Sequence, residues 1–231
     1  GDITRDQCKR AVAIANQFLK KPIDMPDRCC IERFWKRVSV LPFAEEEKLE
    51  IFRSFYLGIK GGTASTSHAH MDAGSFVFDA LGVRWVQDLG MQEYYSLEKE
   101  NVDLWNSSQE GQRWDVFRYN NLAHSTLTVN GKYHRVKGFV PVTNIYSDDH
   151  KLGASLEMTE LFGGDLKSAV REVALINEKY LSVTDRVQAD DQPASVRWTI
   201  VTGAVPRVLD SHMVELKKDG KCMQLIVDSP S

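Results

Sequence analysis

The residue types best suited to chemistry lie in a short stretch from Ser67 to Phe76. His68, His70 and Asp72 alternate there with small or apolar residues. In an extended strand, side chains two and four residues apart lie on the same face of the chain. We therefore expect these three side chains to project together, and polar groups arranged in this way indicate a functional site.

A second carboxylate should return to this stretch through a β-hairpin. Val77-Phe78 and the segment Val83–Asp88 predict two strands, joined by a tight turn near Ala80-Leu81. Antiparallel pairing about that turn places Asp88 opposite roughly Ala73. Two imidazoles and a carboxylate suit Zn²⁺, but tetrahedral coordination calls for a further ligand.

His124 is the best remaining candidate for that ligand. It stands at the start of a predicted strand that ends in Asn130-Gly131, a dipeptide typical of hairpin turns. The residues therefore predict a metal site of His70, Asp88 and His124, with His68 nearby and not necessarily coordinating. The alternative, that these are isolated polar residues at strand ends, stays open at this point.

Weaker candidates surround this set. Arg113 and Arg118 could supply positive charge to an acidic sugar, and Trp114 a stacking surface, although a Trp among strands is more often part of the core. Asp72 could orient one of the metal-binding histidines without itself binding the metal. Three further histidines lack partners at a meaningful spacing and are predicted to be surface or turn residues: His134, His150 and His212.

The composition narrows the classes of function. The chain has 231 residues, 42% of them apolar, and a net charge of −3 with acidic and basic residues interspersed. That charge distribution argues against a nucleic-acid partner but not against an acidic sugar, which needs only one or two local cations. No apolar run approaches the roughly 18 residues of a membrane-spanning helix. The four cysteines lack C-x-x-C spacing and do not resemble metal ligands.

The chain divides into a helical and a β-rich part. Apolar residues at three- and four-residue spacing predict an amphipathic helix over Arg5–Lys21, and a shorter helix or turn follows around Ile31–Val38. From Ser39 onward, short β-rich runs alternate with Gly-containing turns. We predict a helical segment over residues 1–38 and, over residues 39–231, a mainly β domain built as an antiparallel β-sandwich.

Three sequence blocks together carry a family resemblance. The blocks His68–Phe76, Asp88–Gly90 and His124–Gly131 resemble, in this order and at compatible spacing, the heparinase II/III-like polysaccharide lyases. The resemblance implies an N-terminal α/α toroid packed on an antiparallel β-sandwich, with the catalytic cleft between them. Residues 1–38 would then be the end of the toroid or its linker, and we expect most of the toroid to be missing and the sandwich to be truncated at its C-terminus.

The resemblance also implies roles for single residues. His70, Asp88 and His124 match the zinc ligands of the family, whose ion is mainly structural, and His68 matches a histidine at the catalytic cleft. Ser67 departs from the pattern, because an Asn commonly precedes that histidine. The catalytic Tyr and the groups that neutralise the substrate carboxylate are expected on the missing toroid.

An activity follows from the same resemblance. Such lyases cleave uronic-acid-containing glycans, such as heparin, heparan sulfate or alginate, by β-elimination, and are typically exported, commonly to the bacterial periplasm. This chain alone should be inactive, since it lacks the rest of the cleft. Two alternatives remain open: a non-catalytic carbohydrate-binding or scaffold module, and a cupin-like metalloenzyme.

Overall fold

The computed structural model describes residues 55–228. The helices predicted between residues 5 and 38, and the predicted domain boundary after residue 38, lie outside this range and stay predictions. Within the range, the prediction of a mainly β fold with antiparallel sheets is confirmed. No helix of the described residues is long and apolar enough to cross a membrane.

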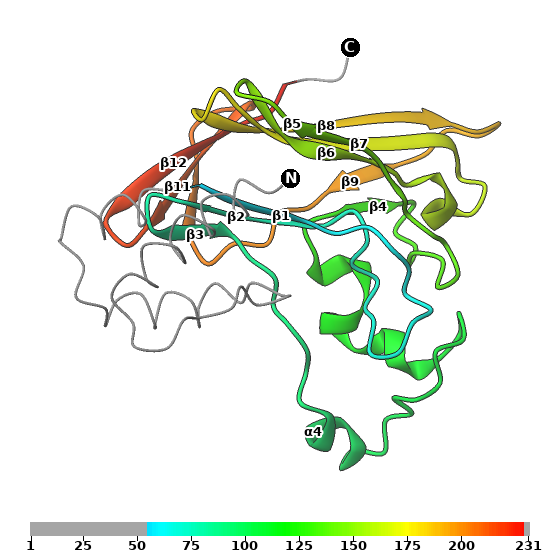
Figure 1. The fold of residues 1–231 in the computed structure, drawn as a ribbon. Helices are drawn as coiled ribbons and strands as arrows, with labels where there is room; N and C mark the ends of the chain where they lie inside the picture. Colours follow the sequence, from blue (N-terminus) through cyan, green and yellow to red (C-terminus); the bar gives the residue numbers. More distant parts are fainter. Residues whose placement is uncertain (1–54, 229–231) are drawn as a thin grey trace, which may run out of the picture.

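Two antiparallel sheets form the two layers of the sandwich (Figure 1). One layer has the strand order β5-β6-β7-β8 and the other the order β1-β2-β3. A third sheet, β10-β11-β12, closes one end, and β4 pairs with β9 beside the two layers. The strands have the following bounds: β1 Tyr56–Ile59, β2 Phe76–Ala80, β3 Val83–Val86, β4 Leu127–Val129, β5 Val142–Ser147, β6 Lys151–Glu157, β7 Leu166–Ile176, β8 Tyr180–Ala189, β9 Val196–Trp198, β10 Val205–Val208, β11 Met213–Lys218 and β12 Lys221–Ile226.

Alternating burial along the strands forms the core between the layers. In β2, Phe76 and Phe78 are buried while Val77 and Asp79 are only partly covered, as expected for a strand with one face on the core. These rings pack with Trp85 of β3, Val173 of β7 and Leu216 of β11. Because the cluster draws on three sheets, burying it from water fixes the sheets against one another.

The β2–β3 hairpin turns one residue later than predicted. Ala80 pairs with Val83, so the turn is Leu81-Gly82, where φ is 55° and 73°. Two consecutive residues in the left-handed region are typical of the tight turn that matches strand twist. A bulge follows in the ladder, which ends at Val86, so Asp88 is not paired opposite Ala73 as predicted.

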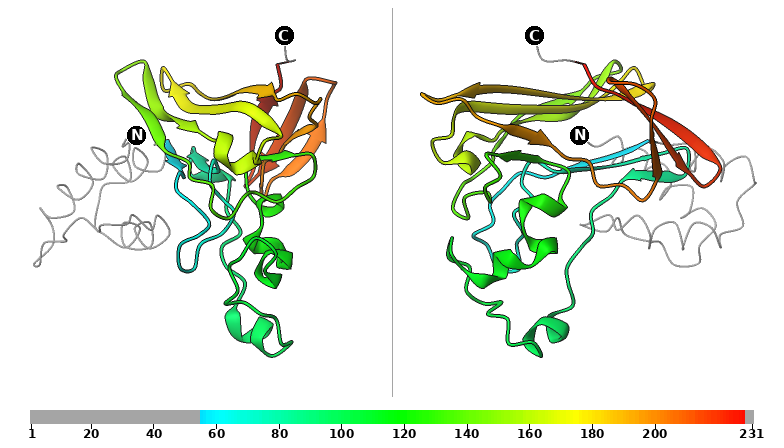
Figure 2. Two further views of the ribbon diagram at one scale, coloured as in Figure 1. Left: turned by 90° about the vertical axis from the view of Figure 1, so that its right-hand side faces the viewer. Right: turned by 180° about the vertical axis from the view of Figure 1, so that it is seen from behind.

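The segment from residue 87 to residue 126, here called the helical lobe, extends from one side of the sheets (Figure 2). It contains one short α-helix, α4 (Tyr94–Glu98), and three 3₁₀ turns: Gln112–Asp115, Phe117–Tyr119 and Asn121–Ala123. It has a core of its own, in which Leu104, Trp114 and Tyr119 pack with Met71 and Val136. The lobe is therefore a compact unit with its own hydrophobic core, and it lies below the sandwich.

A buried arginine connects the lobe to the sheets. Arg171 of β7 has no exposed surface, and its guanidinium forms two bonds of 2.7 and 2.8 Å to the carboxylate of Asp185 in β8. It also donates to the carbonyl oxygens of Gly74, at 2.8 Å, and Ser125, at 3.0 Å. Gly74 follows the His-x-His stretch and Ser125 follows His124, so one side chain holds both segments of the predicted site.

Candidate active site and metal centre

The structure brings together the three predicted metal-binding residues from distant parts of the sequence. His70 lies in the turn-rich segment before β2, Asp88 follows β3, and His124 precedes β4. The centroids of the two imidazole rings are 5.6 Å apart. Nδ1 of His124 lies 2.7 Å from the carboxylate of Asp88. The predicted grouping of these residues is therefore present in the fold.

The Asp88–His124 pair determines the chemistry of the buried imidazole. An ionised carboxylate only accepts hydrogen bonds, so Nδ1 of His124 is the donor in this pair. Burial raises the pKa of the Asp88 carboxyl, but the hydrogen bonds from His124 and from the Gly90 amide outweigh burial and leave the pKa lowered. Nε2 of His124 is buried and has no hydrogen-bond partner among residues 55–228. One nitrogen of this ring is thus left with its bonding capacity unused.

His70 is neutral over the physiological pH range. Burial lowers the pKa of its imidazole to about 4, although the nearby carboxylate of Asp72 opposes the shift. The ring packs on Tyr119, with centroids 4.6 Å apart, and on His124. A neutral imidazole keeps a lone pair, which a metal ion or a proton can use.

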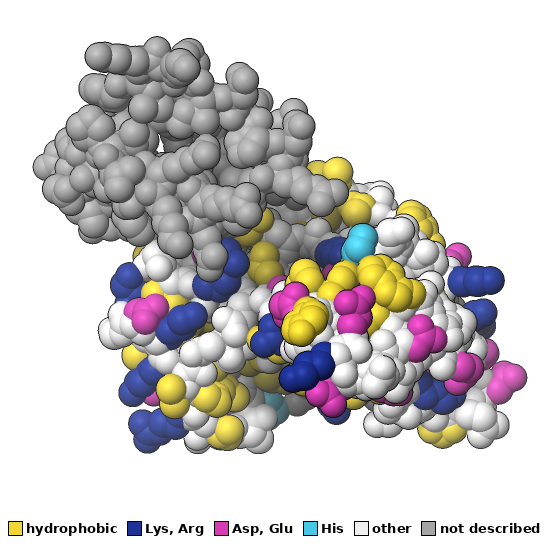
Figure 3. Space-filling model, turned by 90° about the horizontal axis from the view of Figure 1, so that it is seen from below, with side chains coloured by type: hydrophobic (Ala, Val, Ile, Leu, Met, Phe, Trp, Pro, Cys, Tyr) yellow, Lys and Arg dark blue, Asp and Glu magenta, His cyan; other side chains and the backbone are white. Residues whose placement is uncertain are grey.

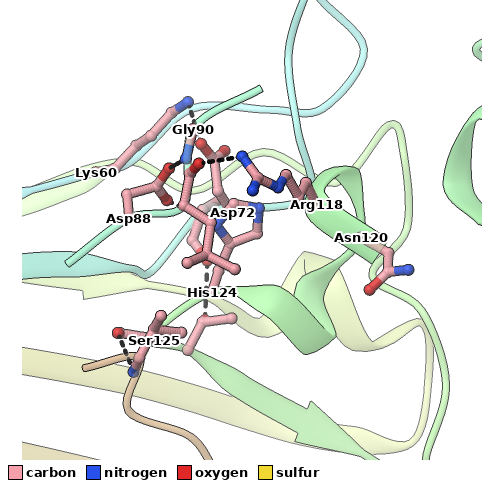
Figure 4. Close-up of polar contacts among 12 residues, drawn as sticks. Lys60, Asp72, Asp88, Gly90, Arg118, Asn120, His124 and Ser125 are labelled. Carbon is pink, nitrogen blue, oxygen red and sulfur yellow. Dashed lines mark hydrogen bonds and ion pairs between the residues drawn. The ribbon is translucent and has the colours of Figure 1, made fainter. Parts of the chain in front are cut away.

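Charged side chains border this group on two sides (Figure 4). Asp72 is buried and forms an ion pair of 2.6 Å with Lys60. Arg118 donates to the carbonyl oxygens of Leu89, at 2.9 Å, and Met91, at 3.3 Å. Arg118 therefore holds in place the segment after β3 that contains Asp88. Its predicted role as a substrate contact stays a prediction.

His68 does not share a face with His70 and Asp72, so the extended geometry expected for this stretch is wrong. The segment forms turns, and His68 has a φ of 61°, in the left-handed region that histidine enters more readily than most residues. The reversal turns His68 to the surface while His70 and Asp72 stay buried.

An aromatic group surrounds the exposed His68. Its Nδ1 atom lies 2.8 Å from the hydroxyl of Tyr94 in α4, and the two rings are stacked. Trp105 packs edge-on against both rings, with centroids 6.2 Å from His68 and 5.6 Å from Tyr94, and is 65% exposed. Sequence reasoning missed Trp105, because an isolated Trp in a polar segment carries no spacing signal. We call these three residues the aromatic platform.

Arg113 proves to be a structural residue. It is 5% exposed, and its guanidinium donates to the carbonyl oxygens of Leu104, at 3.2 Å, and Ala69, at 2.9 Å. It also lies over the ring of Tyr119, at 4.5 Å from the centroid. These contacts point its charge into the lobe core, so Arg113 cannot meet a substrate as predicted. Trp114 is buried beside it, as expected for a core residue.

The comparisons with known proteins fit this geometry. The family described as "Heparinase II/III-like, C-terminal" matches residues 50–230, which is most of the chain. The chain belongs to this family. Comparison with curated protein sequences gives no match.

Solved structures of two heparinases share the family fold. Heparan sulfate lyase HepC from Pedobacter heparinus is 19% identical, with a TM-score of 0.55 over 74% of this chain and 25% of that one. A heparinase III with methylated lysines is 15% identical, with a TM-score of 0.54 over 75% of this chain and 25% of that one. This chain thus spans about a quarter of the length of these relatives. A heparinase II/III-like sandwich also rules out the cupin-like alternative, because a cupin would need a single small barrel.

In this heparinase-like domain, His70, Asp88 and His124 are of the residue types that bind zinc. Two imidazoles and a carboxylate are typical zinc donors, and the unused Nε2 of His124 supplies a ring nitrogen in need of a partner. Across residues 55–228, however, no three His, Cys, Asp or Glu side chains are arranged around a common point. Here Asp88 instead holds the His124 ring, as carboxylates behind metal-binding histidines do. The ligand set of His70, Asp88 and His124 stays a prediction.

His134 is not the surface residue that its sequence context predicts. It is 1% exposed, its Nε2 atom donates to the Leu127 carbonyl oxygen at 2.8 Å, and its ring packs edge-on against Phe162. Burial lowers the pKa of its imidazole to about 4, although the bond to Leu127 opposes the shift. His150 and His212 do lie exposed in turns, as predicted.

We expect His134 to make the domain less stable in acid. The folded-state pKa is about 4 and the unfolded value is 6.5, so below pH 6.5 the unfolded chain takes up a proton that the folded chain refuses. Stability should be independent of this group above pH 6.5 and fall by up to about 1.4 kcal/mol per pH unit between 6.5 and 4. Urea unfolding of the chain and of a His134→Gln variant at pH 7.5 and 5 measures this. Equal pH dependence of the two proteins would contradict it.

Proposed function

We propose that this chain is the metal-binding β-sandwich part of a polysaccharide lyase that cleaves uronic-acid-containing glycans by β-elimination. The observation that carries the proposal is the exposed His68, held by Tyr94 at the surface two residues before His70 of the buried group with Asp88 and His124. Because the relatives above are heparan sulfate and heparinase-type lyases, we take a heparan sulfate-like glycan as substrate ahead of an alginate-like one.

The proposed reaction needs two proton transfers at neighbouring sites. A base removes the C5 proton of the uronic acid, and the electron pair of that C–H bond forms the C4–C5 double bond. The bond from C4 to the glycosidic oxygen breaks, and an acid protonates the departing oxygen. An imidazole can accept or donate a proton, and His68 is exposed to solvent. We assign His68 to one of these transfers.

Tyr94 and Trp105 complete the surface around His68. The hydroxyl of Tyr94 occupies Nδ1 of His68 and thereby leaves Nε2 for the substrate. We therefore propose Tyr94 as a positioning residue. The indole of Trp105 is open to solvent and can stack on the apolar face of a sugar ring. In Figure 3, which views the molecule from the side of α4, hydrophobic side chains gather around a histidine on this face.

The rest of the cleft belongs to a second domain. The family is described as C-terminal and the chain spans a quarter of its relatives. We propose that an α/α toroid supplies the second catalytic group and the cations that neutralise the substrate carboxylate. The chain alone should therefore release no unsaturated product. We place the complete protein outside the cytoplasm, in the periplasm of a bacterium, where such glycans are met.

We propose that His70, Asp88 and His124 hold a zinc ion. The support is that His124 lies close to both His70 and Asp88, that His70 is neutral, and that Nε2 of His124 has no partner among residues 55–228. A buried nitrogen without a partner costs about 1–3 kcal/mol, which a metal bond removes. When bound, the ion would supply structural cross-linking of three chain segments. His68, two residues from His70, would then gain a fixed backbone position.

Zinc should raise the thermal stability of the chain. Binding only to the folded state stabilises by about 2.7 kcal/mol at a hundredfold excess over Kd. We expect the melting temperature to fall by several degrees on treatment with a chelator and to recover with zinc. His70→Gln should abolish both the metal content and the shift, whereas His212→Gln, at an exposed turn, should retain them. A chain that binds no zinc, or whose melting temperature ignores it, would remove this part of the proposal.

A further inference from the structure

A hollow of about 400 Å³ lies between the helical lobe and the chain segments that follow β4 and precede β7. Four parts of the chain line it: residues 107–109 of the lobe, Val129 at the end of β4, the segment 132–137 that follows, and the turn at 161–165 before β7. Buried Val136, Leu161 and Phe162 form an apolar floor. The volume lies within the roughly 300–1,000 Å³ of typical small-ligand sites.

The described lining of the hollow carries a net positive charge, and two of its basic side chains form no ion pair with a described residue. Among the described residues, Asp165 is the one carboxylate of the lining, and Lys132 neutralises it through contacts of 2.8 and 2.9 Å. Arg135 and Lys137 also line the hollow, and no hydrogen bond or ion pair to another residue between 55 and 228 involves either side chain. Figure 3 shows acidic and basic side chains interspersed over the face seen from below, so positive charge is a local property of this hollow.

The wall that carries these cations is held in place. Gln109 bridges two backbone groups, donating to the His134 carbonyl oxygen at 3.0 Å and accepting from the Val136 amide at 2.8 Å. The Arg135 amide donates to the Leu161 carbonyl oxygen at 2.9 Å. The stem of Arg135 lies over Gly163, where a Cβ atom would come within 2.8 Å of its Cδ. A glycine at this position thus lets the guanidinium stem lie flat along the wall.

We propose that this hollow is a second binding site for the acidic glycan, taking a carboxylate- or sulfate-bearing sugar unit remote from the bond that is cleaved. Arg and Lys are the side chains that bind such groups, and Tyr133, which is 36% exposed, adds an aromatic surface at the rim. The segment from Trp105 to Ser107 connects the aromatic platform with the hollow. A glycan chain can therefore follow this segment from one site to the other. The inference rests on the proposed function.

The test compares two variants that lose the same charges. Arg135→Gln/Lys137→Gln removes both cations of the hollow. Arg207→Gln/Lys179→Gln removes one Arg and one Lys from exposed positions elsewhere on the sandwich. Isothermal titration of the 231-residue chain with a sulfated heparin hexasaccharide, at one fixed salt concentration, gives the Kd of each protein. We expect the hollow variant to bind at least about tenfold more weakly, and the control to stay within about twofold.

Three results would overturn the second site: no measurable binding by the unchanged chain, an unchanged Kd in the hollow variant, or equal losses in both variants. The last would indicate diffuse charge attraction. The proposed function is tested separately, by measuring whether the complete protein forms unsaturated product from a short oligosaccharide. Elimination that persists in the hollow variant while its Kd is unchanged would reject the second site alone. Absence of elimination, with tenfold weaker binding in the hollow variant, would reject the lyase alone.

Discussion

Replacing His68 by alanine in the complete lyase should lower kcat by about 10²- to 10⁴-fold, the usual contribution of a general acid or base. His68 is the exposed histidine of the His68-Ala69-His70 stretch, and its ring is oriented by the hydroxyl of Tyr94 at 2.8 Å. The side chain makes no buried contact that holds the sheets, so the folded domain should survive the change. The rate of formation of unsaturated product from heparan sulfate measures the effect.

His150→Ala is the matched control, because His150 is exposed in a turn far along the chain from the platform. It should retain full activity. Tyr94→Phe should reduce kcat less than His68→Ala and change the pH profile of kcat, since it removes only the group that positions the imidazole. Undiminished turnover in His68→Ala would remove this residue from the mechanism.

Replacing Arg171 by methionine should destabilise the domain by about 3–5 kcal/mol, the usual cost of breaking a buried ion pair from one side. The guanidinium has no exposed surface and makes four hydrogen bonds, two to Asp185 and one each to the carbonyls of Gly74 and Ser125. Methionine fills the volume but leaves a carboxylate and two carbonyl oxygens without donors. Urea unfolding of the chain measures the loss.

Arg197→Met provides the control, because Arg197 is exposed on β9 and its loss should change the free energy of unfolding by less than about 0.5 kcal/mol. Zinc affinity should fall with Arg171→Met as well, since Ser125 adjoins His124. Equal stability of the two variants would show that Arg171 does not join the lobe to the sheets.

The local patterns in the sequence predict the sandwich where strands are amphipathic. The segments around β2, β3 and β4 carry β-branched and aromatic residues and appear where expected. β6 escapes such reasoning because it contains Gly153, whose hydrogen faces the backbone of β7. A Cβ atom there would lie 2.1 Å from the Val173 carbonyl oxygen. Close approach between strands thus demands a residue of low strand propensity.

The proximity of the candidate residues was predictable, but their geometry was not. Spacing and resemblance together point to His70, Asp88 and His124, and in the fold His124 lies near each of the other two, although the described residues place no three such side chains around a common point. The outward turn of His68 depends on a single positive φ, which no alternation pattern reveals. The inward turn of Arg113 depends on carbonyl acceptors at Ala69 and Leu104, and such long-range partners exist only once the lobe has folded.

The most direct test of the central proposal is an assay of the complete protein on a panel of uronic-acid polysaccharides, following the ultraviolet absorbance of the unsaturated product. The panel should contain heparan sulfate, heparin, chondroitin, hyaluronan and alginate, with the 231-residue chain assayed in parallel. We predict unsaturated oligosaccharides from heparan sulfate or heparin with the complete protein and none with the chain alone. Binding of these glycans by the complete protein without any unsaturated product would contradict the account and identify a carbohydrate-binding module.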